Sequence, residues 1–267
     1  MSWDTLFADN RAAWDQRVPI HAASRFYDVA GFKRGASTLQ DVELGLVGDV
    51  SGKSLLHLQC HFGLDTLSWA RRGARVVGVD FSARAIELAR ELARDVGVGA
   101  RFVECNVYDT RAHLEELFDV VFTSYGVIGW LPELCPWAQV IAASLAPGGR
   151  FVLVELHPYL WMSQVGPDLL PRYSYFNTGP ISEVTSGTYA ERSAQLSLKE
   201  HGWNHPIADV INALLEAGLV VDRVGEHDTS PWEIFPNMER AGAEGYCFSA
   251  APKMVPMLFS LRCVRRG

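Results

Sequence analysis

The chain has 267 residues, of which 48% are hydrophobic and 21% charged, and its formal net charge is −7. This composition is typical of a globular protein, and the length allows one large domain or a domain with a sizeable insertion. No apolar run approaches the roughly 18 residues that cross a bilayer, and the first residues do not resemble a secretory signal. We therefore expect no membrane segment and a cytoplasmic location. The acidic balance argues against a nucleic-acid partner, because phosphate backbones are bound by clustered Lys and Arg.

The cysteines and aromatic residues narrow the class of protein further. Five scattered cysteines show no paired spacing, which predicts neither a disulfide framework nor a metal site. The chain also contains eight Trp, eight Tyr and thirteen Phe. Such an aromatic content suits a packed core, and it also suits an apolar cavity for a small ligand.

The first fifty residues differ from the rest of the chain. Apolar spacing predicts a helix over residues 3–20 that Pro19 ends, and an amphipathic turn or two over residues 39–46. We therefore interpret residues 1–50 as an N-terminal helical cap.

Strands and helices alternate from residue 51 onward, which defines a domain over residues 51–267. The predicted strands are 53–58, 74–79, 100–104, 119–123, 151–156, 220–226 and 255–264. The predicted helices are 64–72, 83–96, 137–145 and 205–217. This alternation predicts an α/β fold, namely a doubly wound, Rossmann-like, seven-stranded and mostly parallel sheet with helices on both faces. Ligands of such sheets bind at the carboxyl ends of the strands.

The regular pattern lapses after the fifth strand. Residues 159–200 are rich in aromatic and turn residues, which indicates an insertion of two or three strands, or a lid. Residues 228–249 are polar, aromatic and irregular.

Polar residues follow the first three predicted strands. The segment HLQCHFG (57–63) follows the first strand, Asp80 ends the second about 20 residues later, and Asn106 follows the third. A carboxylate in the position of Asp80 can accept hydrogen bonds from both hydroxyls of a ribose. The alternatives are that Asp80 shares a helix cap with Ser82 and that Asn106 only forms a turn.

With these pieces in order, the sequence resembles the class I S-adenosylmethionine-dependent methyltransferases. The resemblance covers residues 51–158 well and the last helix and strand weakly. The matching segments are HLQCHFG (57–63), VGVDFS (77–82), CNV (105–107), FDVVFTSYG (118–126) and LAPGGRFVLVE (145–155). One departure stands out, because the family's first loop reads acidic–x–Gly–x–Gly–x–Gly. Here these positions hold His57, Gln59, His61 and Gly63, so one glycine remains and the acidic residue is absent.

The resemblance implies S-adenosylmethionine as the cofactor and assigns its contacts. Residues 59–63 would surround the methionine part, Asp80 would hold the ribose, and Phe81 and residues 106–107 would contact the adenine. Ser124 and Tyr125 would line the methyl end. Tyr27 would close over the carboxylate, with a core tyrosine as the alternative. The implied cofactor residues are Tyr27, Gln59, Cys60, His61, Gly63, Asp80, Phe81, Asn106, Val107, Ser124 and Tyr125.

The acceptor side rests on weaker patterns. His157 follows the fifth strand and is a candidate general base, with a structural histidine as the alternative. Glu155 lies two residues before it, on the same face of the strand, and would orient His157 or bind substrate. The candidate substrate residues are Trp14, Trp130, Glu155, Trp161 and Tyr175.

The sequence therefore predicts an enzyme that methylates an oxygen or nitrogen of a small molecule. Two alternatives stay open at this point. One is a non-catalytic S-adenosylmethionine-binding protein of regulation or assembly, and the other is a methyltransferase of protein or RNA.

Overall fold

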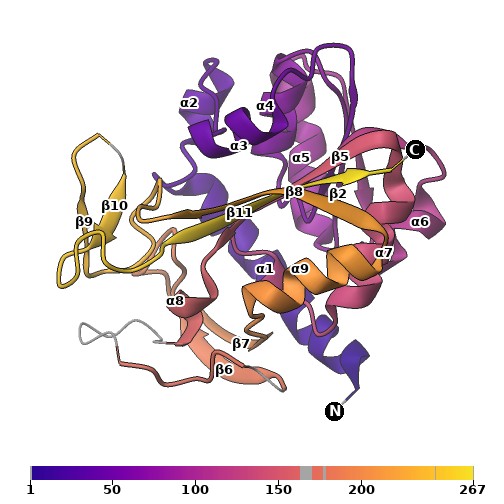
Figure 1. Cartoon of the computed structure of the whole chain (residues 1–267). Coiled ribbons are helices and arrows are strands. Elements are labelled where there is room, and N and C mark those ends of the chain that lie inside the picture. The colour runs from indigo at the N-terminus through magenta and orange to yellow at the C-terminus, as the bar shows by residue number, and fades with distance from the viewer. Residues whose placement is uncertain (1, 163–169, 177–178, 244, 267) are drawn as a thin grey trace.

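The computed structural model describes residues 2–162, 170–176, 179–243 and 245–266 (Figure 1). Three helices precede the first strand: α1 (Trp3–Ala23), α2 (Val29–Lys33) and α3 (Asp41–Val47). Among all the described residues, no helix is long and apolar enough to cross a membrane.

The centre of the molecule is a seven-stranded sheet in the order β3-β2-β1-β4-β5-β11-β8 (Figure 1). Strands β3, β2, β1, β4 and β5 are parallel, whereas β11 runs antiparallel to both β5 and β8. The prediction of a seven-stranded, mostly parallel sheet is confirmed. The strands are β1 (Ser54–Leu58), β2 (Arg75–Asp80), β3 (Ala100–Glu104), β4 (Phe118–Ser124), β5 (Leu145–Leu156), β8 (Leu219–His227) and β11 (Leu258–Arg265).

Helices cover both faces of this sheet. Neighbouring residues of a strand point to opposite faces, so each strand contributes apolar side chains to two cores. Leu56 and Val121 belong to the core beneath α7 and α9, whereas Leu55 and Phe122 belong to the core beneath α3 and α4. Ser82 caps α5, since its hydroxyl accepts the Ala85 N–H at 3.1 Å. The remaining helices and short 3-10 turns are α4 (Leu64–Arg71), α5 (Ala83–Asp95), η1 (Val107–Asp109), α6 (Thr110–His113), η2 (Ile128–Trp130), α7 (Leu134–Ser144), α8 (Pro158–Met162) and α9 (Ile207–Glu216).

Two small antiparallel sheets lie outside the central one. Strands β6 (Ile181–Ser186) and β7 (Ser197–Gly202) pair within the predicted insertion, and we call them the lid sheet. Residues 163–169 and 177–178 of that insertion lie outside the described residues. The second sheet joins β9 (Met238–Arg240) to β10 (Tyr246–Phe248), in a segment whose sequence predicts irregular structure. Strands of three residues are too short to produce a recognisable alternation.

The prediction that Pro19 ends the first helix is wrong, because α1 continues to Ala23. A proline inside a helix removes one backbone hydrogen bond. Here the residues around it, Arg17, Val18 and His21, are buried. Their packing holds the last turn of α1 against the body of the protein.

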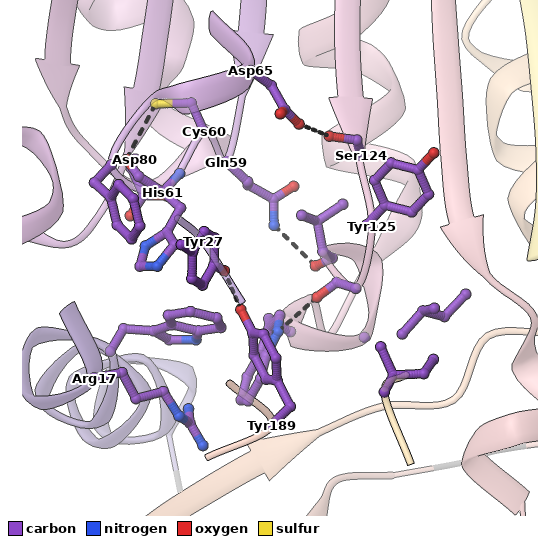
Figure 2. Close-up of a pocket in the computed structure, with 18 of the residues that line it drawn as sticks. Arg17, Tyr27, Gln59, Cys60, His61, Asp65, Asp80, Ser124, Tyr125 and Tyr189 are labelled. Atoms are coloured by element: carbon purple, nitrogen blue, oxygen red, sulfur yellow. Dashed lines mark hydrogen bonds between the residues drawn. The ribbon is translucent and has the colours of Figure 1, made fainter. Parts of the chain in front are cut away.

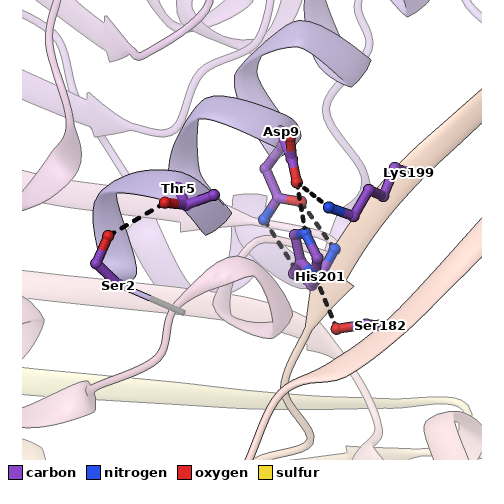
Figure 3. A network of polar contacts seen from close by, with 7 residues as sticks. Ser2, Thr5, Asp9, Ser182, Lys199 and His201 are labelled. Atoms are coloured by element: carbon purple, nitrogen blue, oxygen red, sulfur yellow. Dashed lines mark hydrogen bonds and ion pairs between the residues drawn. The ribbon is translucent and has the colours of Figure 1, made fainter.

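A polar network joins α1 to the lid sheet (Figure 3). The Asn10 side chain donates to the His201 carbonyl at 2.8 Å and accepts the His201 N–H at 2.9 Å. The His201 ring contacts the Asp9 carboxylate at 3.0 Å and the Ser182 hydroxyl at 2.8 Å. Lys199 Nζ lies 2.8 Å from the same Asp9 carboxylate. The lid sheet is therefore anchored to the N-terminal helix by hydrogen bonds to both its main chain and its side chains.

We expect Asn10→Ala to loosen the lid sheet. The substitution leaves the buried N–H and carbonyl of His201 without partners, which costs about 1–3 kcal/mol of unfolding free energy. Hydrogen exchange should become faster in β6 and β7 while the central sheet keeps its protection. Thr5→Ala, at an exposed position of the same helix, is the matched control and should change neither. Equal exchange rates in both variants would contradict the anchoring role.

Candidate functional site

A cavity of about 970 Å³ lies at the carboxyl ends of the parallel strands (Figure 2). The segments that follow β1, β2, β3 and β4 form one wall. Residues of α1 and of the lid sheet form the opposite wall. All the cofactor residues that the resemblance implies line this cavity: Tyr27, Gln59, Cys60, His61, Gly63, Asp80, Phe81, Asn106, Val107, Ser124 and Tyr125.

The loop after β1 keeps a glycine-like backbone without the expected glycines. Gln59 has φ 57° and His61 has φ 51°, in the left-handed region that glycine adopts without strain. Two hydrogen bonds hold this conformation: His61 N–H to Asp80 Oδ2 at 2.8 Å, and Gln59 Nε2 to the Val127 carbonyl at 2.9 Å. Gly63 has φ 77°, and a Cβ there would come within 2.7 Å of the Phe102 ring. Gln59 and His61 therefore place large side chains where the family has glycine. Position 63 still requires glycine, because of its positive φ and the nearby Phe102 ring.

Asp80 is the carboxylate at the centre of this wall. Its Oδ1 accepts the Ser82 N–H at 2.9 Å, and its Oδ2 accepts the His61 N–H. Burial raises the pKa of Asp80 to about 6, against the lowering effect of these bonds. Asp80 thus holds the loop in place and still lines the cavity.

The neighbouring residues form an apolar and amide-lined end of the cavity. Phe81, Asn106 and Val107 all line it. Asn106 Oδ1 accepts the Tyr108 N–H at 3.2 Å, so the turn-forming role is also present.

Burial raises the pKa of the Cys60 thiol well above its ordinary value, which leaves this group un-ionised at neutral pH.

A second carboxyl group lines the cavity near the end of β4. Asp65, in the first turn of α4, accepts the Thr38 hydroxyl at 2.5 Å and the Ser124 hydroxyl at 3.3 Å. Burial raises its pKa. Behind it, the Tyr125 hydroxyl donates to Glu43 at 2.6 Å. Asp65 and Glu43 gave no recognisable signal in the sequence, because an acidic residue in the first turn of a helix is common for reasons of helix stability alone.

Aromatic side chains link the loop to the opposite wall. The Trp14 ring lies edge-on to His61 and to Trp130, with centroids 5.1 and 5.4 Å apart. His61 Nε2 lies 3.1 Å from Nδ1 of His21, and burial lowers the pKa of both rings, so both are neutral. The Tyr27 hydroxyl is hydrogen-bonded to that of Tyr189, which lies between β6 and β7 (Figure 2). Tyr189 and His21 gave no recognisable signal in the sequence.

The acceptor-side predictions divide into two groups. Trp14, Trp130 and Trp161 line the cavity, as expected of substrate residues. Tyr175 does not line it; its hydroxyl instead accepts the Ile207 N–H at 3.4 Å.

Glu155 and His157 also lie outside the cavity lining, whereas Leu156 between them lines it. Glu155 is buried and accepts the N–H groups of Gly126, Val127 and Ile128, so it shapes the segment after β4. His157 Nε2 lies 3.0 Å from Glu226 Oε1, and its Nδ1 accepts the Tyr159 N–H at 3.1 Å. Alternation along β5 directs Glu155 to the face opposite Leu156. His157, which follows the strand, is directed to Glu226 of β8. We therefore assign neither a substrate role to Glu155 nor a base role to His157.

Glu43 provides a test of the buried carboxyl group behind the site. Burial, followed in importance by nearby Asp65, raises its pKa to about 8. Between about pH 5 and pH 8 the folded state therefore holds a proton that the unfolded state has lost, and this lowers stability as pH rises. The decline is at most about 1.4 kcal/mol per pH unit. We expect Glu43→Gln to remove this part of the pH dependence.

Urea unfolding of both proteins across this pH range measures the difference in unfolding free energy. The advantage of Glu43→Gln should grow with pH, whereas Glu87→Gln, at an exposed position of α5, should follow the parent protein. A constant difference across the range would show that Glu43 is ionised throughout.

Comparison with known proteins agrees with this architecture. Residues 55–149 match a family model described as a methyltransferase domain. The chain is 30% identical over 139 residues to a ubiquinone biosynthesis O-methyltransferase of Aeromonas salmonicida, covering 51% of this chain and 58% of that protein. It is 29% identical over 157 residues to the protein of the same name from Cronobacter sakazakii, covering 56% of this chain and 64% of that protein. The matches thus span less than two thirds of these relatives.

Solved structures share the fold at low sequence identity. A methyltransferase from Listeria monocytogenes described as S-adenosylmethionine dependent superposes with a TM-score of 0.58 at 16% identity, covering 89% of this chain and all of that one. The complex of DhpI with SAH superposes with a TM-score of 0.58 at 14% identity, covering 99% of each chain.

Proposed function

We propose that this chain, which carries a class I methyltransferase domain, binds S-adenosylmethionine and transfers its methyl group to an oxygen or nitrogen of a small molecule. The observation that carries the proposal is the cavity at the strand ends, with Asp80 and Asp65 both lining it. Buried carboxyl groups at two positions suit a ligand that offers ribose hydroxyls at one end and positive charge at the other.

The nucleoside half of the cofactor would occupy the end of the cavity formed after β2 and β3. Asp80 would accept hydrogen bonds from the ribose, as its position at the end of β2 favours. The Phe81 ring would pack against the adenine, and Asn106 and the Val107 amide would contact the edge of the base.

Asp65 would take the place of the acidic residue that the first loop lacks. His57 occupies the family's acidic position, and burial lowers the pKa of His57 to about 3, so its ring is neutral. Its Nδ1 lies 2.8 Å from the Thr66 hydroxyl. The Asp65 carboxyl lies one residue before Thr66, lines the cavity, and can pair with the ammonium group of the methionine part.

The protein's contribution to the chemistry is positioning. The sulfonium of the bound cofactor supplies a methyl group that is already activated for displacement. The chain would hold the acceptor in line with that methyl group, and its largely apolar cavity would exclude water. The lid sheet and α1 enclose a volume suited to a small molecule, which favours a small-molecule acceptor over a protein or RNA.

Titration calorimetry with S-adenosylhomocysteine tests the cofactor role of Asp80. We expect Asp80→Asn to weaken binding by about 1–3 kcal/mol, because a charged hydrogen-bond acceptor is lost. Since the pKa of Asp80 is about 6, affinity in the parent protein should fall as the pH drops below 6 and the group becomes protonated. Asp80→Asn should lose that pH dependence, and Asp95→Asn, exposed at the end of α5, should behave like the parent. No binding by the parent protein would overturn the proposed function.

A comparison of two ligands distinguishes the proposed binding role of Asp65 from a purely structural role. Asp65→Asn should weaken S-adenosylhomocysteine roughly tenfold, as expected for one lost charge-assisted hydrogen bond. It should leave 5′-methylthioadenosine unaffected, because that compound lacks the ammonium group. An equal loss for both ligands would place Asp65 in a purely structural role.

A further inference from the structure

Arg17 is a buried cation in the wall of the cavity. It comes from α1, and its side chain is 7% exposed. Among the described residues that line the cavity it is the only lysine or arginine. Its guanidinium lies over the rings of Trp14 and Trp130, 5.1 and 5.7 Å from their centroids.

The hydrogen-bonding capacity of Arg17 is only partly used. Its Nη2 pairs with Glu200 of the lid sheet, whose other carboxylate oxygen accepts the Thr185 hydroxyl at 2.7 Å. Arg17 Nε and Nη1 are buried and have no hydrogen-bond partner in the described part of the chain. Unpaired buried donors of a charged group are costly, so this arrangement favours an anion brought by a ligand.

The position of Arg17 points to the acceptor rather than to the cofactor. Figure 2 shows Arg17 on the wall opposite Asp65 and the loop after β1. The surfaces beside it include α1, the lid sheet and Trp130, whereas the proposed contacts of the nucleoside half of the cofactor follow β2 and β3. The Trp14 and Trp130 rings beside the guanidinium also line the cavity and stand edge-to-face to each other, with centroids 5.4 Å apart.

We infer that Arg17 binds the carboxylate of the methyl acceptor, and that the acceptor is an aromatic acid whose ring packs against Trp14 and Trp130. The inference rests on the proposed function and names the substrate class for the same site. A guanidinium recognises a carboxylate by directed N–H donors, and aromatic walls select a planar apolar body. Glu200 would hold Arg17 in place, and Nε and Nη1 would be the donors left for the carboxylate of the acceptor.

Calorimetry on the complex with S-adenosylhomocysteine tests this inference with two probes that share one ring. The probes are 3,4-dihydroxybenzoate and its neutral counterpart 3,4-dihydroxybenzamide. The parent protein should bind the benzoate at least tenfold more tightly than the benzamide. Arg17→Gln should abolish that preference, Arg17→Lys should retain part of it, and Arg11→Gln, at an exposed position of the same helix, should retain all of it.

Arg17→Gln leaves the Glu200 carboxylate unpaired, so the double variant Arg17→Gln/Glu200→Gln keeps the test available if the single variant does not fold. It should also lose the preference for the benzoate. No binding of the benzoate by the parent complex, or equal binding of both probes, would overturn the inference. So would a variant that loses S-adenosylhomocysteine as strongly as the benzoate, because Arg17 would then serve the cofactor. Failure of the parent protein to bind S-adenosylhomocysteine would instead contradict the proposed function.

Discussion

The geometry of the site depends on the two hydrogen bonds that the Asp80 carboxylate accepts, from the N–H groups of His61 and Ser82. They tie the end of β2 to the loop after β1 and to the start of α5. A non-glycine residue with positive φ costs on the order of 1 kcal/mol or more, and the bond to His61 offsets part of that cost. The loop can therefore carry large side chains where the family has glycine. One of these, His61, extends toward Trp14 and so joins the strand ends to the opposite wall.

The carboxyl groups of Asp80 and Asp65 and the guanidinium of Arg17 lie on opposite walls of the cavity. Asp80 and Asp65 lie on the wall formed by the strand ends, where burial raises both pKa values. Arg17 lies on the wall formed by α1, paired with Glu200 of the lid sheet. Arg17 Nε and Nη1 are buried without hydrogen-bond partners in the described part of the chain, and an anionic group of a ligand would relieve this. The network of Asp9, Asn10 and His201 joins α1 to the lid sheet and so holds the second wall together.

Much of the central sheet was predictable because buried parallel strands form short apolar runs with turn residues at their ends. This placed Asp80, Asn106 and Ser124 at one edge of the sheet, and all three line the cavity. The same reasoning placed Glu155 and His157 at that edge, yet neither lines the cavity. Alternation says that two residues share a face of a strand, but not which face the ligand occupies. In the folded chain it is the intervening Leu156, on the face that α3 and α4 cover, that lines the cavity.

The sequence by itself determined the order of strands and helices and the edge at which polar residues collect, because periodicity and turn chemistry are local properties. Only the tertiary structure decided that Arg17, Asp65 and Tyr189 share one cavity. These residues lie far apart along the chain and belong to a helix, a helix and a loop whose own patterns predict nothing about a ligand. Their roles arise from the directions of their side chains, which long-range packing sets and local sequence does not encode.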